Sequence, residues 1–425
     1  MTNYKLQNIS TGRIFDDTGW VLTDPDASKP SLIRAIYENK KFVIDESLPG
    51  FYKFSNWLPI CKTLEHSAPT ITYKSKELAK ILGVENLYIS FSGYWPEIGA
   101  NMTTCSFKET EAYSVCARQI PDPSRVMVVA SAGNTARAFA KVCSENRIPL
   151  VVVIPEDNLN ALWFESQLAD CVKIICTPSG TDYFDAIDLS SKICKSPKFF
   201  EEGGAKNVAR RDGMATTVLS AVSTIGKIPD YYFQAIGSGT GTIAAWESNL
   251  RLIEDGRYGT NKMILIPSQN FPFTPMYDAW KVGSRELLPF DDDDARDKAL
   301  QIIAKVLSNR RPPYSVPGGL FDALTDTNGD IEIADNGESE KACAIFEETE
   351  GVDIYHASGI ALAGMIKSIN KGKVDRKKIL MLNITGGGEN RFKSTRKFIM
   401  AKPDLILSNK NDNDIICSKV EAFFK

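Results

Sequence analysis

Residues 101–112 read Asn-Met-Thr-Thr-Cys-Ser-Phe-Lys-Glu-Thr-Glu-Ala, a small polar turn that leads into a lysine and then a helical pattern. Most lysines at the start of a helix are solvated surface residues, so Lys108 alone indicates no function. Two later stretches change this interpretation, because each joins an apolar run, a tight loop of small residues and a helical pattern. They are residues 126–135, which end in Ser-Ala-Gly-Asn-Thr, and residues 232–241, which end in Gly-Ser-Gly-Thr-Gly.

The second of these loops is typical of an anion site. Glycines permit positive φ and the close approach of a phosphate. At a helix N-terminus, the unpaired N–H groups and the helix dipole favour a negative charge. The loop does not match the dinucleotide fingerprint G-x-G-x-x-G, although a nucleotide-dependent oxidoreductase stays an alternative. The residues expected to hold a phosphate are Gly237, Ser238, Gly239, Thr240 and Gly241.

The first loop permits two interpretations. Its Ser, Asn and Thr side chains can simply cap the next helix, and small-residue packing equally explains its glycine. Alternatively, the exposed N–H and hydroxyl donors bind a substrate carboxylate, while Asn134 bonds a ring hydroxyl. The candidate substrate-binding residues of this loop are Ser131, Ala132, Gly133 and Thr135.

The order of the remaining elements predicts an α/β fold. Apolar strands alternate with helices between residues 125 and 230, and again in the second half of the chain, which is typical of parallel sheets covered on both faces. A chain of 425 residues is too long for one simple core. We expect an N-terminal extension over residues 1–60, a large domain over 61–124 and 231–425, and a small domain over 125–230.

Composition and charge argue against several classes of function. The chain has 43% hydrophobic and 24% charged residues, and its formal net charge of −3 offers no basic face for nucleic acid. No apolar run of about eighteen residues is present and the first residues lack a signal-peptide core, so we expect a cytoplasmic protein without a membrane span. Nine scattered cysteines form no C-x-x-C pair and only two histidines occur, so no metal site is expected.

An amine, an anion site and hydrogen bonds to a ring are together what pyridoxal phosphate requires. At these residues the sequence resembles the fold-type II family of pyridoxal-phosphate enzymes, which includes threonine synthase and cysteine synthase. The resemblance covers roughly residues 50–400. Its motifs are Ser106-Phe107-Lys108, residues 131–135 and residues 237–241.

This resemblance implies a fold like that of the tryptophan synthase β subunit, with two doubly wound α/β domains and the active site between them. It also implies pyridoxal 5'-phosphate as the cofactor, Lys108 as the catalytic residue that forms a Schiff base with it, and a homo-oligomer. Thr385, directly after the last apolar strand, falls beside the pyridine nitrogen. The implied cofactor-binding residues are Lys108, Asn134, Gly237, Ser238, Gly239, Thr240, Gly241 and Thr385.

Within this family the chain is most similar to the cysteate synthase group. The similarity rests on residues 107–109, 129–135, 202–214, 234–241 and 318–326. That group replaces the phosphate of O-phospho-L-serine with sulfite, which yields L-cysteate, and it is associated with coenzyme M synthesis. The alternatives are a threonine synthase acting on O-phosphohomoserine, an O-phosphoserine-dependent cysteine synthase, and a non-catalytic binding protein that kept the fold.

Phosphate and sulfite are both anions, so such a site needs local cations although the whole chain is acidic. Lys206, Arg210 and Arg211 are the candidates, with Asn207 as a neutral donor. A helix over residues 206–216 would place Lys206 and Arg210 on one face. The alternative is a solvated basic face of that helix.

Two departures from the family pattern qualify the resemblance. Cys105 stands where a glycine commonly precedes Ser-Phe-Lys, so the approach to the cofactor is expected to differ there. Residues 4–24 have the outline of an N-terminal element found in threonine synthases, but without its cysteines, so no zinc is implied.

Overall fold

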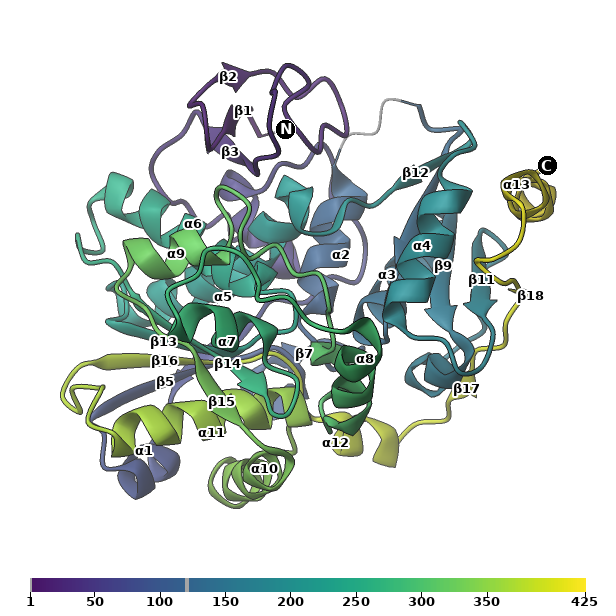
Figure 1. The fold of residues 1–425 in the computed structure, drawn as a ribbon. Helices are drawn as coiled ribbons and strands as arrows, with labels where there is room; N and C mark the ends of the chain where they lie inside the picture. The colour runs from purple at the N-terminus through teal and green to yellow at the C-terminus, as the bar shows by residue number, and fades with distance from the viewer. Residues whose placement is uncertain (1, 119–121) are drawn as a thin grey trace.

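The larger of the two main sheets positions Lys108 and the glycine loop. The computed structural model describes residues 2–118 and 122–425. The sheet consists of β4 (Ile71–Lys74), β5 (Asn86–Phe91), β13 (Tyr231–Ala235), β14 (Ile264–Asn270), β15 (Glu332–Ala334) and β16 (Ile379–Ile384). Its strand order is β15-β14-β13-β16-β5-β4 (Figure 1), and all neighbours are parallel except β4 and β5.

Helices cover both faces of this sheet, which explains why its central strands are buried along almost their whole length. One face carries α1 (Glu77–Leu82), α10 (Asn336–Glu350) and α11 (His356–Asn370), and the other carries α5 (Val208–Ile225), α6 (Thr240–Asp255) and α9 (Leu320–Asp326). Tyr232 packs into the second core and its neighbour Phe233 into the first. This alternation follows from the two-residue period of a strand.

The smaller sheet is parallel throughout, with the order β12-β8-β9-β11-β18. Its strands are β8 (Val126–Ala130), β9 (Leu150–Pro155), β11 (Val172–Thr177), β12 (Phe199–Glu201) and β18 (Leu405–Ile406). One face is covered by α2 (Lys108–Ala117) and α3 (Asn134–Glu145), and the other by α4 (Tyr183–Ile193) and α13 (Asn413–Glu421).

The predicted division of the chain differs from the observed sheets at two places. Helix α5 was assigned to the small domain, yet it packs on β4 and β5 of the larger sheet. Strand β18 and helix α13 were assigned to the large domain, yet they extend the smaller sheet, as Figure 1 shows near the C-terminus. The sequence predicts a helix over residues 206–216 but not the sheet on which it packs, because α5 is buried on almost all sides. It does not reveal β18, because this strand has only two residues.

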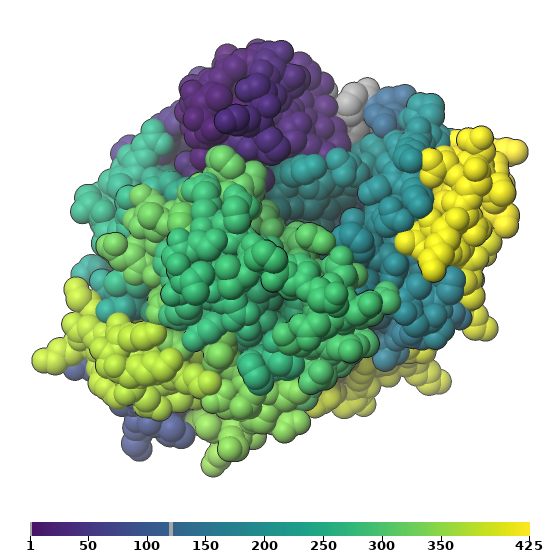
Figure 2. Space-filling model, in the orientation of Figure 1, coloured from purple at the N-terminus to yellow at the C-terminus, as the bar shows by residue number. Residues whose placement is uncertain are grey.

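The N-terminal segment forms an antiparallel sheet of its own from β1 (Tyr4–Asn8), β2 (Ile14–Phe15) and β3 (Ile33–Tyr37). In Figure 2 it is the purple protrusion at the top of the molecule. Its anchor is the carboxylate of Glu247 on α6, which lies 3.3 Å from Nε of Arg34 and 2.9 Å from Nε of Arg211. A buried ion network therefore joins this segment to the large sheet.

The other elements connect these layers. They are α7 (Pro275–Lys281), α8 (Asp292–Gln301), α12 (Glu389–Ser394), β6 (Tyr94–Trp95), β7 (Ala100–Asn101), β10 (Trp163–Phe164) and β17 (Ile399–Met400). Short 3-10 helices span Gly50–Trp57, Pro96–Ile98, Glu156–Ala161, Gly204–Lys206, Lys305–Leu307 and Ala422–Phe424. Of the helices in the described residues, none has the length and apolar character needed to cross a membrane.

Replacing Glu247 with Gln should destabilise the protein, because its side chain is 1% exposed and neutralises two guanidinium groups. Removing one partner of a buried ion pair costs about 3–5 kcal/mol. Although burial raises the pKa of Glu247, Arg211 and Arg34 outweigh it and hold that pKa below its ordinary value. The stabilisation is therefore present above the unfolded-state pKa and is lost as the pH falls through the folded-state pKa.

Denaturant unfolding measures this effect. The difference in unfolding free energy between wild type and Glu247→Gln should be largest at neutral pH and shrink below about pH 4. Glu254→Gln on the same helix is the control, because Glu254 is 54% exposed and its pair with Lys40 should contribute less than about 1 kcal/mol. Equal losses in the two variants would contradict the anchoring role of Glu247.

Candidate active site

Lys108 is the first residue of α2 and lies beside the carboxyl end of β16. The loop before it is hydrogen-bonded to the loop after that strand. The N–H of Phe107 donates to the carbonyl of Thr385 at 2.9 Å, and the N–H of Gly387 donates to the carbonyl of Cys105 at 3.0 Å. Two residues predicted to act on the same cofactor, Lys108 and Thr385, are thereby brought together from distant parts of the chain.

Cys105 occupies a left-handed backbone conformation in this loop, with a φ of +53°. Glycine adopts this conformation without steric cost, which explains the glycine expected at this position. The side chain is fully buried, and burial raises the pKa of its thiol well above the ordinary value. Since the thiolate is the reactive form, Cys105 is suited to packing rather than to nucleophilic chemistry.

One cavity brings Lys108 together with the residues predicted to bind the cofactor. Its wall includes Lys108, Asn134, the five residues of the glycine loop and Thr385. The remaining lining is mostly apolar and consists of Phe107, Met214, Ala235, Ile236, Val306, Leu307 and Ala357, with Ser106, Gln234 and Tyr355 as further polar members. Such a wall suits an aromatic ring that carries polar groups at its edge.

The glycine loop offers the free donors that a phosphate needs. It joins β13 to α6, and within the described chain no acceptor takes the N–H of Gly237, Ser238 or Gly239. Gly239 has a φ of +78°. A Cβ on Gly237 would lie 2.9 Å from the Cα of Leu307, so a larger residue would displace the backbone there.

Asn134 and Thr385 present polar side chains to the same cavity. The Oδ1 of Asn134 accepts a hydrogen bond from Nη2 of Arg137 at 3.2 Å, which leaves its NH2 group as a donor for a ligand. The hydroxyl of Thr385 has no partner in the part of the chain that the structure describes. One amide donor and one hydroxyl at the edge of an apolar cavity fit the hydroxyl and the nitrogen of a pyridine ring.

Arg137 orients part of this site, and sequence reasoning missed it. The residue is 3% exposed, and its guanidinium donates through Nη2 to the carbonyl of Thr104 and the hydroxyl of Tyr355, both at 2.9 Å. It also lies 4.2 Å from the ring centre of Trp163. The sequence did contain a hint of this role, because Arg137 lies three residues after Asn134 and side chains at that spacing share one face of a helix.

Glu111 was also missed, although it contacts the catalytic candidate directly. Its Oε2 lies 3.2 Å from Nζ of Lys108, and its Oε1 accepts a hydrogen bond from the hydroxyl of Thr135 at 2.8 Å. Burial lowers the pKa of Lys108; Glu111 opposes this effect and Arg210 adds to it, and the net direction is downward. A lowered pKa increases the share of neutral amine, which is the form that attacks an aldehyde or accepts a proton.

The loop predicted to bind the substrate carboxylate lies beside the cavity, and of its residues only Asn134 lines the wall. The hydroxyl of Ser131 accepts from the N–H of Gly133 at 3.0 Å, and the carbonyl of Ala132 accepts from the amide of Asn158 at 2.8 Å. These bonds stabilise the turn itself. A contact of the loop with substrate therefore stays a prediction.

The predicted helix over residues 206–216 is wrong at its start. Lys206 ends a separate 3-10 turn, and α5 begins at Val208, so Lys206 and Arg210 do not share a helical face. Asn207 is the N-cap of α5, and its Oδ1 accepts from the N–H of Ala209 at 3.0 Å. Asparagine is among the strongest N-cap residues, which explains why the helix begins after it.

The two arginines that follow have different surroundings. Arg211 is buried in the Glu247 network that anchors the N-terminal segment. Arg210 lies close to Lys108 instead, because its Nη1 is 3.5 Å from the same Oε2 of Glu111. Its Nε also donates to Glu202 at 2.8 Å. Of these two cations, only Arg210 is placed to meet a ligand near Lys108.

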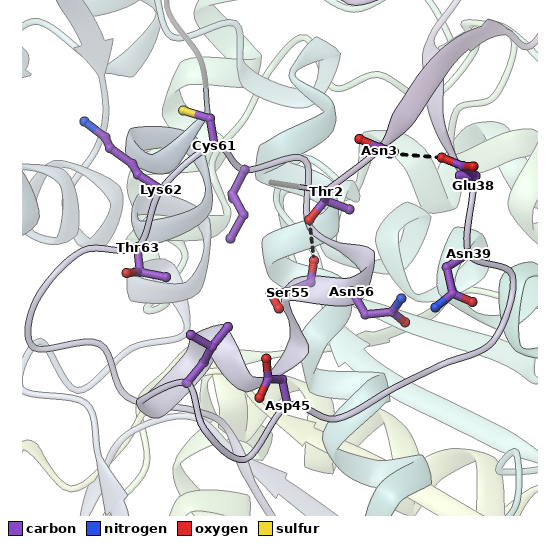
Figure 3. Close-up of a pocket in the computed structure, with 12 residues that line it drawn as sticks. Thr2, Asn3, Glu38, Asn39, Asp45, Ser55, Asn56, Cys61, Lys62 and Thr63 are labelled. Atoms are coloured by element: carbon purple, nitrogen blue, oxygen red, sulfur yellow. Dashed lines mark hydrogen bonds between the residues drawn. The ribbon is translucent and has the colours of Figure 1, made fainter.

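A second hollow lies within the N-terminal segment (Figure 3). Its polar side chains bond within the segment: the hydroxyl of Thr2 donates to the carbonyl of Ser55 at 2.8 Å, and the amide of Asn3 donates to Glu38 at 3.1 Å. None of the predicted site residues lines it. The candidate chemistry therefore belongs to the cavity around Lys108.

The sequence model for the family described as pyridoxal-phosphate dependent enzyme matches residues 64–386. The chain belongs to this family. Pyridoxal 5'-phosphate is its cofactor, so the predicted family, cofactor and enzymatic nature are confirmed. The cavity fits this cofactor, since it combines a lysine amine, a loop with free N–H groups and an apolar wall edged by a hydroxyl and an amide.

This pyridoxal-phosphate enzyme is similar over nearly its full length to curated proteins named cysteate synthase. The one from Methanosarcina acetivorans is 46% identical over 96% of this chain and 98% of its own length. The one from Methanosarcina mazei is 43% identical over the same shares. The one from Methanospirillum hungatei JF-1 is 40% identical over 100% of this chain and 99% of its own.

Solved structures of the same family share the fold. Maize serine racemase aligns with a TM-score of 0.56 at 14% identity, over 76% of this chain and 91% of that one. Serine racemase from Dictyostelium discoideum aligns with a TM-score of 0.53 at 16% identity, over 75% of this chain and 92% of that one. These likenesses confirm the predicted fold-type II α/β architecture.

Replacing Gly239 with Ala should weaken cofactor binding at least about tenfold, or ~1.4 kcal/mol. The new Cβ would be strained at a φ of +78° and would lie 3.1 Å from Leu320 Cδ2, which displaces the N–H groups of the loop. Titration of the cofactor-free protein with pyridoxal phosphate, followed by absorbance, gives the dissociation constant.

Gly256→Ala is the matched control for this measurement. Gly256 ends the same helix, has a φ of +80° and has open space around its Cα, so the substitution imposes similar backbone strain far from the cavity. Its affinity for the cofactor should stay close to that of wild type. If both variants bind the cofactor equally well, the glycine loop does not hold the phosphate.

Proposed function

We propose that this protein exchanges the phosphate of O-phospho-L-serine for sulfite and releases L-cysteate and inorganic phosphate. The observation that carries the proposal is the similarity over nearly the whole chain to proteins named cysteate synthase. The cavity around Lys108 supports it, because it combines the parts that a pyridoxal-phosphate enzyme needs with a nearby arginine that can bind an anion.

Four groups of the chain would hold the cofactor. The N–H groups of residues 237–239 would bind its phosphate, the NH2 group of Asn134 would donate to its ring hydroxyl, and the hydroxyl of Thr385 would interact with its pyridine nitrogen. Pyridoxal phosphate, carried by Lys108 until the substrate amine replaces it, would withdraw electrons from the α-carbon of the substrate and so make the α-proton acidic. Because Thr385 is neutral, it does not stabilise a protonated pyridine nitrogen, and this favours prompt loss of the β-substituent.

Lys108 moves the proton. With the amino-acid substrate bound, Nζ of Lys108 would accept the proton from the α-carbon, and its lowered pKa suits this role. The bond from the β-carbon to the phosphate oxygen then breaks, and phosphate leaves with the electron pair. The sulfur of sulfite forms the new bond to the β-carbon, and Lys108 returns a proton to the α-carbon.

Arg210 is the cation best placed to bind the phosphate group of the substrate. Its side chain is 12% exposed, and it contacts the same carboxylate oxygen of Glu111 that Lys108 contacts. In the ligand-free chain it is balanced by Glu202 and Glu111. A guanidinium has five N–H donors, so donors remain for an anion after these carboxylates are bonded.

Product analysis with O-phospho-L-serine and sulfite tests the proposal. L-cysteate should form only when both substrates are present, and one phosphate should be released for each L-cysteate. The Lys108→Ala protein should form no product and lack the absorbance band at roughly 410–430 nm. Parallel reactions with O-phosphohomoserine alone, and with O-phospho-L-serine and sulfide, test for threonine and cysteine. Threonine or cysteine as the main product, without L-cysteate, would overturn the proposal.

Replacing Arg210 with Gln should raise the KM for O-phospho-L-serine at least about tenfold, or ~1.4 kcal/mol. Lys206→Gln in the same assay should raise it by less than about twofold, because Lys206 is exposed and lies outside α5. Circular dichroism and the cofactor absorbance establish that both variants are folded and loaded. An unchanged KM in Arg210→Gln would refute the role of Arg210.

Three further expectations from the sequence stay predictions. They are the homo-oligomeric state, the cytoplasmic location and the binding of the substrate carboxylate by residues 131–135.

A further inference from the structure

Glu111 is a buried carboxylate next to the amine that carries the cofactor. It lies one helical turn after Lys108 on α2, and its side chain has no solvent exposure, whereas that of Lys108 is 21% exposed. Burying a carboxylate is costly unless it is paired and hydrogen-bonded. A buried acid at this place therefore needs partners that compensate for its lost hydration.

The partners of Glu111 come from three helices. Its Oε2 lies 3.2 Å from Nζ of Lys108 on α2 and 3.5 Å from Nη1 of Arg210 on α5. Its Oε1 accepts a hydrogen bond from the hydroxyl of Thr135 on α3 at 2.8 Å. The bond to Thr135 fixes the carboxylate so that its other oxygen faces the amine.

A neighbouring residue shows that this arrangement is not a general feature of the helix start. Glu109 is equally buried on α2, but its carboxylate accepts from the backbone N–H of Thr104 and does not contact the lysine amine. Glu109 therefore stabilises the loop before α2. Glu111 instead directs one of its carboxylate oxygens, Oε2, toward the amine of Lys108.

We propose that Glu111 is a positioning residue that holds the amine of Lys108 whenever this amine is not bonded to the cofactor. It keeps Nζ in a fixed place before the cofactor is loaded and each time the substrate amine has displaced the lysine. It also stabilises the ammonium form after Nζ has accepted a proton. The inference rests on Lys108 as the cofactor-bearing lysine and not on the identity of the substrate.

The charges around the amine determine the sign of the expected effect. They are Glu111 on α2, Arg210 on α5 and Glu202 after β12. The titratable hydroxyl of Tyr183 on α4 lies close enough to Arg210 and Glu202 to interact with their charges. Glu111 is the largest contributor that raises the pKa of Lys108, and Arg210 lowers it. Removing the charge of Glu111 should therefore lower this pKa and increase the share of neutral amine at neutral pH.

The test measures the amine of Lys108 directly in the full-length protein freed of cofactor. Brief acetylation with acetic anhydride over a pH series, followed by peptide mass spectrometry, gives the pH at which Lys108 is half reactive. In Glu111→Gln this midpoint should fall by about 1 unit or more. The rate of recombination with pyridoxal phosphate, divided by the share of neutral Lys108 amine at the same pH, should fall, because the amine is no longer held in place.

Glu202→Gln is the matched control. It removes the same charge from a buried carboxylate that also binds Arg210, but Glu202 makes no contact with Lys108, so its midpoint shift should be less than half that of Glu111→Gln. If Glu111→Gln does not fold, the double variant Glu111→Gln/Arg210→Gln removes one charge of each sign. Its midpoint should still fall, because Glu111 affects the pKa more than Arg210 does.

A folded variant without Glu111 whose Lys108 midpoint equals that of wild type would overturn the proposal. In that case the carboxylate would serve only to join α2 to α3 and α5. The assay contains no amino-acid substrate, so its outcome is independent of whether the protein forms L-cysteate.

Discussion

The active site depends on two backbone hydrogen bonds that join the loop before α2 to the loop after β16. They connect Phe107 with Thr385 and Gly387 with Cys105, and they hold Lys108 and Thr385 on one cavity. The loops meet this closely because residues 386–388 are glycines: a Cβ on Gly386 would lie 2.8 Å from the carbonyl of Cys105. Main-chain contacts thus fix the position of the backbone at Lys108 relative to the backbone at Thr385.

The charges of the site are organised by the same need to compensate burial. An acidic chain that binds anionic substrates must concentrate cations locally, and each buried cation near Lys108 is held by carboxylates or carbonyls. Arg210 is bonded to Glu202 and Glu111, while Arg137 donates to the carbonyl of Thr104 and the hydroxyl of Tyr355. Paired in this way, the cations can be buried at low cost and still have donors left for a ligand.

Sequence reasoning succeeded where function follows from neighbouring residues and failed where it follows from packing. The glycine loop was singled out because strand, loop and helix patterns are local, whereas the roles predicted for Lys108 and Thr385 came from the resemblance to a known family. Glu111 and Arg137 were missed, although each lies one turn from a recognised residue. The role of Glu111 appears only when α2, α3 and α5 pack together, and that of Arg137 only when α3 meets Thr104 and Tyr355. Lys206 was predicted to lie on helix α5, but that helix begins only after Asn207, its N-cap, and Lys206 belongs to the 3-10 turn before it.

By itself the sequence indicated the alternation of strands and helices, because this follows from local periodicity. Its short motifs also indicated the family and the cofactor, because they resemble those of known pyridoxal-phosphate enzymes. Only the tertiary structure decided which carboxylate faces the amine of Lys108, which arginine lies near it and which sheet receives the C-terminal strand. The physical reason differs between these contacts. Arg210 and the C-terminal strand meet partners far away in the chain, so only the packing of whole helices and sheets brings them together. Glu111 lies only three residues from Lys108, but its orientation depends on the hydroxyl of Thr135 on another helix.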